Sequence, residues 1–521
     1  MKQKNLLYVL AGFLVIKLAL HLYLNPQWSF HRDELLYLAL GRRLDWGYAS
    51  VPAGIGFWAW MGEHLFGGSV WGIRLISTLF GTATIGLTGL MTIEMMPREH
   101  YGIRFNLVLV GLAGLTCGAF LRPCMLFMPV VFDVFYWTLI CFFLLKYINS
   151  RQSVWLIWLG VATGIGLLNK YTVFILLFAL LPGLFLSPLR GIFTEKRLYL
   201  GAGLALLTIS PNLYWQYDHG FPLFHHFGAL AETQFAHVTV GAFTGDQFLF
   251  YLSAVPVWLA GLYFLLWHKT AAAWRVFGWM FLTTIAVLLY FSAKSYYSLG
   301  AYPVLIAAGA SFLSTLTANR FRWVRWVLLV WLMGFGALSI PTALPLFPAE
   351  KEAKFIQELA QTPGLEGILR WEDGQQHAMP QDFADMMGWE ELGHQMGKIW
   401  QADPDKSTAY IYAENYGQAG AIEQFGRAYR VPEVWSFSDN YQYWLPEAPP
   451  PGLKTLYYVN DELGDDMPGF FQEIEKVWAL DMPLSRQHGV QIYRCTQPTP
   501  AFFERIGKAI QAVKTNQQIE D

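Results

Sequence analysis

Apolar runs of about 20 residues recur through the first two thirds of the chain, and this is the length that a helix needs to cross about 30 Å of hydrocarbon. Polar breaks between the runs divide this part of the 521-residue sequence into about eleven predicted membrane spans. The predicted spans are 5–24, 69–91, 104–121, 126–147, 154–169, 171–188, 198–214, 247–267, 276–292, 299–317 and 326–346. The first span ends in Leu24-Asn25-Pro26-Gln27, without the small residues of a signal cleavage site, so we expect it to remain as an anchor.

Two connections between spans are too long to be simple turns. Within residues 25–68, the stretch 30–43 reads FHRDELLYLALGRR, with apolar residues at helical spacing and a charged rim. This pattern predicts a helix lying in the membrane interface, and a second short apolar helix is expected up to about Phe66. Residues 215–246 form the other long connection, which is rich in aromatic residues and histidine.

The pattern changes after residue 346, where the long apolar runs stop. Residues 409–412 and 456–459 are short apolar stretches typical of buried strands, and residues 418–425 have a helical pattern. We therefore predict a transmembrane domain over 1–346, with interfacial helices in 25–68, followed by a soluble α/β domain over 347–521.

Charge separates the same two parts. The first 346 residues contain 22 basic and 11 acidic side chains, and the remaining 175 contain 14 basic and 27 acidic ones. Only 14% of the whole chain is charged, against about 25% in ordinary globular proteins, which argues against a soluble enzyme. The basic residues are spread singly between apolar runs, so no nucleic-acid partner is expected. The four cysteines have neither a metal-ligand nor a disulfide spacing.

The basic residues of the short connections predict the orientation, because cytoplasmic loops carry an excess of Lys and Arg. With the N-terminus inside, the cytoplasmic segments carry Lys2, Lys4, Arg98, Arg104, Lys146, Arg151, Arg190, Lys196, Arg197, Lys269, Arg275, Arg320, Arg322 and Arg325. The opposite side carries Arg32, Arg42, Arg43, Arg122, Lys170 and Lys294. An odd number of spans then places the C-terminal domain outside, which for a bacterial cytoplasmic (inner) membrane means the periplasm or the cell exterior.

Acidic residues of the first 346 positions concentrate on this outer side, which predicts that the active site faces outward. Asp33 and Glu34 form the most informative pair. Neighbouring side chains on a helix point in different directions, so one of them can contact a substrate while the other holds the helix or a basic residue. The alternative is an interfacial acid pair neutralised by Arg32, Arg42 or Arg43.

Asp133 lies within an apolar run, where an unpaired charge costs roughly several kcal/mol. It is therefore a candidate functional acid. Its alternative role is to pack helices while paired with Arg122. Lys170 joins two apolar runs at the outer face, where its amine could also simply reach toward water. Together with Arg122 and Lys294 it could form an anion site at the membrane boundary, suited to a phosphate.

The histidines of the second long connection match no zinc-ligand spacing, and substrate contact or an interfacial aromatic role is favoured for them. They are His219, His225, His226 and His237.

Several short stretches resemble a known family in their order along the chain. They are Arg32-Asp33-Glu34, Phe127 to Asp133, Leu168-Asn169-Lys170-Tyr171-Thr172, Pro211 to Trp215 with His219-Gly220-Phe221-Pro222, Tyr296-Tyr297 followed by Ala301-Tyr302-Pro303, and Glu414-Asn415-Tyr416-Gly417-Gln418-Ala419. In this order the sequence resembles the bacterial branch of the protein-O-mannosyltransferase-like (dolichyl-phosphate-mannose-protein mannosyltransferase-like) family of the glycosyltransferase C superfamily. One departure is that residues 47–52 read GYASVP, where the family often has a His-Pro-Pro stretch.

The resemblance implies an all-α polytopic membrane domain of the glycosyltransferase C type, carrying an enzyme of the cell envelope. Such an enzyme moves a hexosyl or pentosyl group, with inversion, from a polyprenyl-phosphate donor to an extracytoplasmic glycan, lipid or protein acceptor. It also implies that Asp33 is the catalytic base. Whether a divalent cation is needed stays open, because members of the superfamily differ.

The same resemblance gives the other candidate residues their roles. Lys170, followed by Arg122 and Lys294, would bind the donor phosphate. Glu34 and Asp133 would position the acceptor, orient the basic residues or hold a divalent ion. Further candidate substrate contacts are Tyr171, His219, Tyr296 and Tyr297.

Two other classes of function compete with this enzyme. One is a transporter or flippase of a lipid-linked sugar, in which Asp133 and Lys170 would be translocation groups. The sequence disfavours it, because the charges lie toward one membrane face and no internal repeat is visible. The other is a scaffold whose C-terminal domain recruits partners.

Overall fold

The computed structural model describes residues 2–96, 103–233 and 239–515, and most of them are helical. Every predicted span falls on a helix or on a pair of consecutive helices. These are α1 (Lys2–Leu24), α4 (Val70–Glu94), α5 (Ile103–Thr116), α6 (Gly118–Met125), α7 (Pro129–Ser150), α8 (Val154–Asn169), α9 (Val173–Phe185), α10 (Lys196–Asp218), α12 (Val240–Leu249), α13 (Val255–Trp267), α14 (Arg275–Tyr290), α15 (Tyr302–Leu316) and α16 (Trp323–Ala343).

The number of membrane crossings depends on how the bent helices are counted. Within the described ranges, six segments are long and apolar enough to span a bilayer, and up to eight are if each bent pair is one span. The bent pairs are α5 with α6, at 54°, and α12 with α13, at 74°. The helices α8 and α9 are apolar but shorter, and α10 packs along α8. The protein is therefore a multi-pass membrane protein. The eleven predicted spans exceed these eight because they also include α8, α9 and α10.

Lys17 of α1 stabilises the break between α5 and α6. A helix that stops inside a membrane leaves carbonyl groups without partners, and hydrocarbon cannot supply any. The buried Lys17 amine donates to the carbonyl oxygens of Gly114, at 3.2 Å, and Phe120, at 2.7 Å, on either side of the break. This gives the Gly114 carbonyl, near the end of α5, a partner and ties α1 to the first turn of α6.

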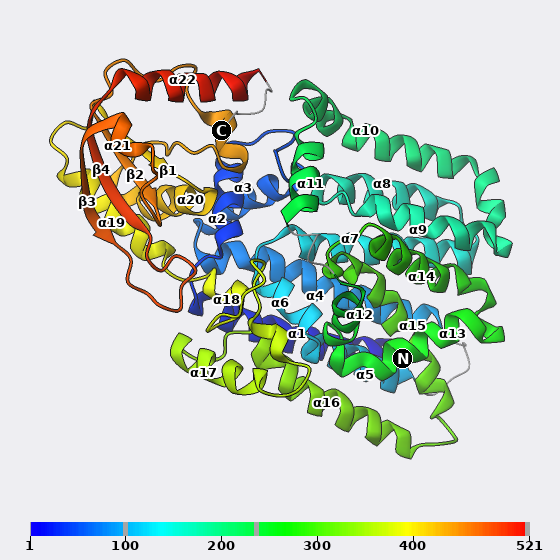
Figure 1. The fold of residues 1–521 in the computed structure, drawn as a ribbon. Helices are drawn as coiled ribbons and strands as arrows, with labels where there is room; N and C mark the ends of the chain where they lie inside the picture. The colour runs from blue at the N-terminus through cyan, green and yellow to red at the C-terminus, as the bar shows by residue number, and fades with distance from the viewer. Residues whose placement is uncertain (1, 97–102, 234–238, 516–521) are drawn as a thin grey trace.

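The first long connection contains the two helices predicted for it. Residues 25–68 form α2 (Arg32–Arg42) and α3 (Gly54–Phe66), and Figure 1 shows α2 crossing the ends of the spanning helices next to the C-terminal domain. The second connection contributes α11 (Pro222–Thr233). Short 3-10 turns complete the chain: Asn25–Gln27, Pro188–Thr194, Leu252–Ala254, Lys269–Trp274, Ser295–Ala301, Glu366–Leu369, Arg427–Tyr429 and Asp439–Trp444.

The C-terminal domain is built around a four-stranded sheet of order β1-β2-β4-β3, in which β1 and β2 are parallel and the other pairs antiparallel. The elements after α16 are α17 (Ala349–Ala360), which packs against the ends of α1, α6 and α16, and then α18 (Gln381–Ala384), α19 (Trp389–Ala402), β1 (Ala409–Ala413), α20 (Tyr416–Phe425), β2 (Thr455–Asn460), α21 (Met467–Phe470), β3 (Phe471–Ala479), β4 (Gln491–Pro498) and α22 (Pro500–Lys514). The predicted α/β class is confirmed, and the two predicted strands coincide with β1 and β2.

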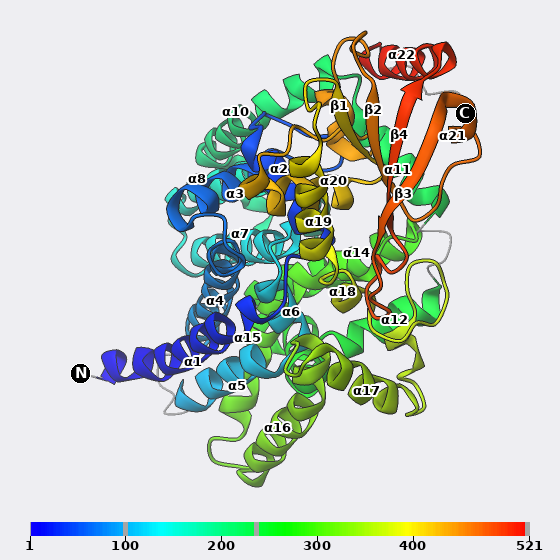
Figure 2. The same ribbon diagram turned by 90° about the vertical axis from the view of Figure 1, so that its left-hand side faces the viewer.

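One face of the sheet packs against α19 and α20, and the other packs against α22. The first of these cores continues without a break into α2, α3 and α7. Figures 1 and 2 show α20 lying between the sheet and α2, so the domain rests directly on the helix that carries Asp33.

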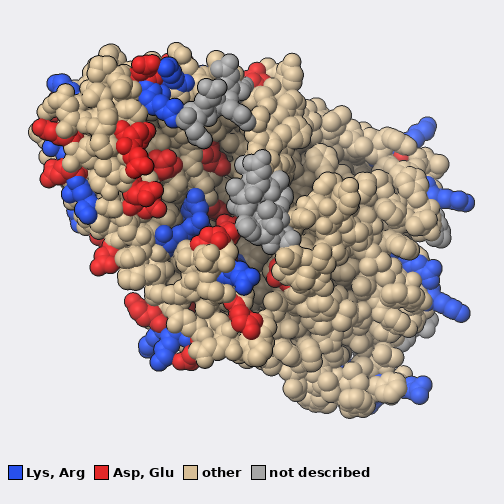
Figure 3. Space-filling view, in the orientation of Figure 1, with Lys and Arg blue, Asp and Glu red and all other residues tan. Residues whose placement is uncertain are grey.

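Charged side chains divide the surface into zones. In Figure 3 they gather over the C-terminal domain, while a broad uncharged belt covers the spanning helices. A few Lys and Arg side chains project at the end of the helices farthest from the domain. An uncharged belt of this kind matches a bilayer, which solvates apolar side chains and excludes charges.

Candidate active site

The first turn of α2 separates the two neighbouring acids. His31 is the N-cap, and its ring nitrogen Nδ1 accepts a hydrogen bond from the Asp33 N–H at 3.1 Å. The His31 N–H in turn donates to Glu34 Oε2 at 2.7 Å, which completes a capping box. Glu34 is fully buried, whereas Asp33 is only half-buried.

Glu34 is fully engaged by protein donors. Its carboxylate accepts from Arg74 Nη2 at 2.7 Å, from Arg74 Nε at 3.0 Å and from the Phe127 N–H at 2.7 Å. No surface is left for an acceptor, so Glu34 takes the other role considered for the pair, which is to hold the helix and a basic residue. Its partner Arg74 is not one of the three arginines expected from the sequence.

Asp33 keeps one oxygen available. Its Oδ1 accepts a hydrogen bond from the Tyr416 hydroxyl at 2.7 Å. Within the ranges that the structure describes, no donor engages Oδ2. The guanidinium of Arg32 lies 4.5 Å from the centre of the Tyr416 ring. A carboxylate held through one oxygen with the other free is suited to accept a proton.

Lys170 lies in the loop between α8 and α9, against the faces of two tyrosines. Its Nζ is 4.9 Å from the centre of the Tyr296 ring and 4.8 Å from that of Tyr297. No carboxylate among the described residues lies within ion-pair distance of this amine. The buried Asp133 is near enough to interact with it electrostatically, and its carboxylate accepts from the Thr172 hydroxyl at 2.6 Å.

The structure brings together two of the three expected phosphate-binding cations. Lys294 Nζ lies 5.9 Å from the Tyr296 ring centre and interacts electrostatically with Lys170. Glu372 of the C-terminal domain reaches it at 3.2 Å. Arg122 is engaged elsewhere: it pairs with Asp382 and donates to the Thr342 carbonyl oxygen at 2.5 Å. Arg122 therefore pairs with neither the phosphate candidates nor Asp133.

Tyr171 and His219 both contact residues of α10, at one side of the candidate site. The Tyr171 hydroxyl donates to Asn212 Oδ1 at 2.8 Å. The His219 ring stacks on Trp215, with ring centres 4.0 Å apart, and meets the edge of Tyr443 at 5.5 Å. His219 thus packs between protein aromatic rings, and its predicted contact with substrate stays a prediction.

Asp439 is an acid of the site that sequence reasoning missed. It has a left-handed backbone, with φ 51°, and such strain in a residue other than glycine concentrates at functional sites. Burial raises the pKa of Asp439 to about 6, against hydrogen bonds from Ser50 and from the Asn440 N–H. It also interacts electrostatically with Asp33. Only the place of Asp439 in a Ser-Asp-Asn turn could have drawn attention to it in the sequence.

Metal ligands are not grouped in the described part of the chain: no three His, Cys, Asp or Glu residues there are placed to hold an ion. His237 lies outside the described residues.

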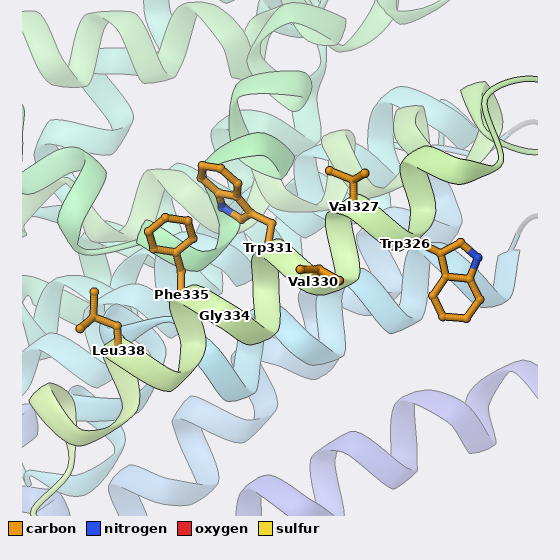
Figure 4. Close-up of a pocket in the computed structure, with 7 residues that line it drawn as sticks. All are labelled: Trp326, Val327, Val330, Trp331, Gly334, Phe335 and Leu338. Atoms are coloured by element: carbon orange, nitrogen blue, oxygen red, sulfur yellow. The ribbon is translucent and has the colours of Figure 1, made fainter.

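An apolar groove lies on a spanning helix. It measures about 620 Å³ and follows one face of α16, as Figure 4 shows. Its lining residues are Trp326, Val327, Val330, Trp331, Gly334, Phe335 and Leu338. None of the candidate site residues lines this groove, so it is a lipid-facing surface separate from the charged site.

These features define a class of protein: a multi-pass helical membrane protein with an acid and a tyrosine-bound lysine beneath a docked sheet domain. Residues 50–215 match the profile of the family described as dolichyl-phosphate-mannose-protein mannosyltransferase. The resemblance to this family expected from the sequence is thereby confirmed. No curated protein sequence matches the chain.

The whole fold is similar to that of ArnT from Cupriavidus metallidurans. The apo structure of ArnT has a TM-score of 0.61 at 13% identity, covering 95% of this chain and 98% of ArnT. The structure of ArnT bound to undecaprenyl phosphate has a TM-score of 0.57 at 14% identity, covering 93% and 97%. The chain thus has the ArnT-like glycosyltransferase C fold along nearly its entire length.

Proposed function

We propose that this protein transfers a sugar from a polyprenyl-phosphate donor to an acceptor hydroxyl, with inversion at the anomeric carbon. The observation that carries the proposal is that Tyr296, whose ring contacts the Lys170 amine, also interacts electrostatically with the half-free carboxylate of Asp33, in a glycosyltransferase C fold. The matching fold of ArnT, solved with undecaprenyl phosphate, supports a lipid-linked donor. The transferred group is a hexosyl or pentosyl residue.

In this mechanism Asp33 is the base. Its Oδ2 takes the proton of the acceptor hydroxyl while the acceptor oxygen forms a bond to the anomeric carbon. The bond from that carbon to the phosphate oxygen breaks, and polyprenyl phosphate leaves with the electron pair. A phosphate is a far better leaving group than an alkoxide, so one carboxylate is enough and no general acid is needed.

Lys170 stabilises the charge that develops on the leaving phosphate. Fixed cations lower the barrier when they meet more charge in the transition state than in the ground state. The two tyrosine rings hold the amine by cation–π contacts without neutralising it as a carboxylate would. Lys294 is the second phosphate contact, and binding requires that the phosphate displace Glu372 from it.

We also propose that the site faces the extracytoplasmic side of a cytoplasmic membrane, with the N-terminus in the cytoplasm. The basic side chains at the far end of the helices support this orientation, since Lys and Arg mark cytoplasmic ends. The C-terminal domain and the acceptor, a glycan, lipid or protein, would then share the periplasm or cell exterior.

The test uses purified full-length protein and a radiolabelled polyprenyl-phosphate sugar. Wild-type protein is expected to release polyprenyl phosphate and to label an acceptor in cell-envelope extract. Asp33→Asn should abolish both while the thermal unfolding temperature stays unchanged. The control is Asp45→Asn, which alters an exposed acid of the same connection. Full turnover by Asp33→Asn, or cysteine labelling that places residue 33 in the cytosol, would refute the assignment.

A further inference from the structure

Tyr416 enters the site from the far end of the chain. It is the first residue of α20, and a capping box between Asn415 and Gln418 fixes its turn. The Gln418 N–H donates to Asn415 Oδ1 at 3.0 Å, and the Asn415 N–H donates to Gln418 Oε1 at 3.4 Å. The backbone that presents the Tyr416 ring is therefore rigid.

Glycines allow α20 to approach α2 closely. A Cβ atom on Gly417 would lie 2.7 Å from Arg32 Cγ, and one on Gly420 would lie 3.0 Å from the backbone carbonyl carbon of Leu35. Any larger residue would force the two helices apart. The absence of side chains at these two positions brings the Tyr416 hydroxyl within hydrogen-bond reach of Asp33.

We propose that Tyr416 is a positioning residue for the reaction, and that the C-terminal domain is thereby part of the catalytic machinery. The inference rests on the proposed function of Asp33 as the base. The Tyr416 hydroxyl holds Oδ1 and so restricts rotation of the carboxylate, which leaves Oδ2 for the acceptor. A base displaced by about 1 Å can lose about 100-fold in rate, so a single orienting bond matters.

The same side chain holds Arg32. The buried Nε of Arg32 has no hydrogen-bond partner among the described residues, and the guanidinium rests on the Tyr416 ring. A cation–π contact thus keeps a positive charge beside the base. Burial, followed by the nearby Asp33 carboxylate, raises the pKa of Tyr416 well above its ordinary value, so the hydroxyl remains a proton donor throughout the working pH range.

The test compares Tyr416→Phe with wild type in the donor-turnover assay, measuring kcat and the KM for the donor separately. Tyr416→Phe keeps the ring beneath Arg32 and removes only the hydroxyl, so kcat should fall by about 10- to 100-fold with the donor KM unchanged. Tyr416→Leu removes the ring as well and should lower kcat further. The control is Tyr457→Phe, which removes another tyrosine-to-carboxylate bond of the same domain, to Asp403, and should retain wild-type kinetics.

The outcomes separate this inference from the proposed function. If wild-type protein turns over the donor but Tyr416→Phe has an unchanged kcat, Tyr416 does not position the base. A raised donor KM at constant kcat would make it a donor-binding residue instead, and would also overturn the inference. If Tyr416→Phe does not fold, Arg32→Gln tests the inference instead. This variant removes the positive charge that the Tyr416 ring holds beside the base, so it should lower kcat and leave the donor KM unchanged. Absence of turnover by wild-type protein would refute the proposed function itself.

Discussion

Glu34 of α2 and Arg74 of α4 form an ion pair in which both side chains are fully buried, with Nη2 and Oε2 2.7 Å apart. Arg74 also donates to the carbonyl oxygens of Asn25, Trp28 and Ser29. A single guanidinium thus holds the chain leading into α2 against a spanning helix. The position of Asp33, one residue before Glu34, depends on this anchor.

We expect Glu34→Gln to destabilise the fold strongly. The substitution leaves the Arg74 charge buried without a counter-charge, which costs about 3–5 kcal/mol of unfolding free energy. Unfolding of the detergent-solubilised protein by denaturant measures this loss. As a comparison, Glu504→Gln removes an exposed carboxylate paired with Lys508 and should leave the unfolding midpoint unchanged. Equal midpoints for the two variants would contradict the anchoring role of Glu34.

Lys170→Met should lower turnover by roughly 100- to 1000-fold, the usual cost of removing one group that stabilises transition-state charge. Methionine keeps an unbranched side chain of nearly the same length but removes the charged amine that contacts the two tyrosine rings. Lys170→Arg should retain part of the activity. Lys269→Met, at an exposed position, serves as the control. Turnover of Lys170→Met at the control level would remove this residue from the site.

Asp439 predicts a pH dependence of stability. Burial raises its pKa to about 6 in the folded protein, from an ordinary value of 3.8. Between these two values the folded state binds more protons than the unfolded state, so stability falls as the pH rises from about 4 to about 6. Asp439→Asn should remove this component and raise the unfolding temperature at pH 7.5 but not at pH 4. Asp461→Asn, at an exposed carboxylate, should leave the profile unchanged, and parallel profiles for wild type and Asp439→Asn would contradict the prediction.

Gly420→Ala should destabilise the docked domain although alanine is the better helix former. Alanine in place of glycine ordinarily stabilises a helix by about 1 kcal/mol. Here the new Cβ would lie 2.9 Å from Leu35 Cβ and 3.0 Å from two backbone atoms of the same residue. We expect a lower unfolding temperature together with reduced turnover. Gly228→Ala in α11, where a Cβ meets open space, should be neutral or stabilising; the same result for Gly420→Ala would show that α20 does not need this close approach.

The spans and the interfacial helices could be predicted because their signal is local. Long apolar runs and helical spacing over 30–43 are visible without any knowledge of the fold. The sheet was harder: β3 reads FQEIEKVWA and is largely exposed at the edge of the sheet, so it has no continuous apolar face. Arg74 was overlooked because its partner lies 40 residues away, although a lone arginine in a spanning helix requires an acid.

The candidate site could be predicted in part. The sequence grouped Lys170 with Lys294, Tyr296 and Tyr297, and these residues lie together in the structure. Their catalytic roles stay predictions. Arg122 was placed in the same group because its acid, Asp382, lies 260 residues away and cannot be recognised from spacing.

Tyr416 lies in one of the stretches that resemble the family, but the sequence assigns it no function in the site. Only the folded chain brings it to Asp33. The bond between these two residues joins positions 383 apart. A growing chain that has inserted all its helices but not yet made α20 still lacks one wall of its reaction centre. Membrane insertion and the onset of catalysis would therefore be separate events in the maturation of this protein, and an unfinished chain would leave its lipid-borne sugar untouched.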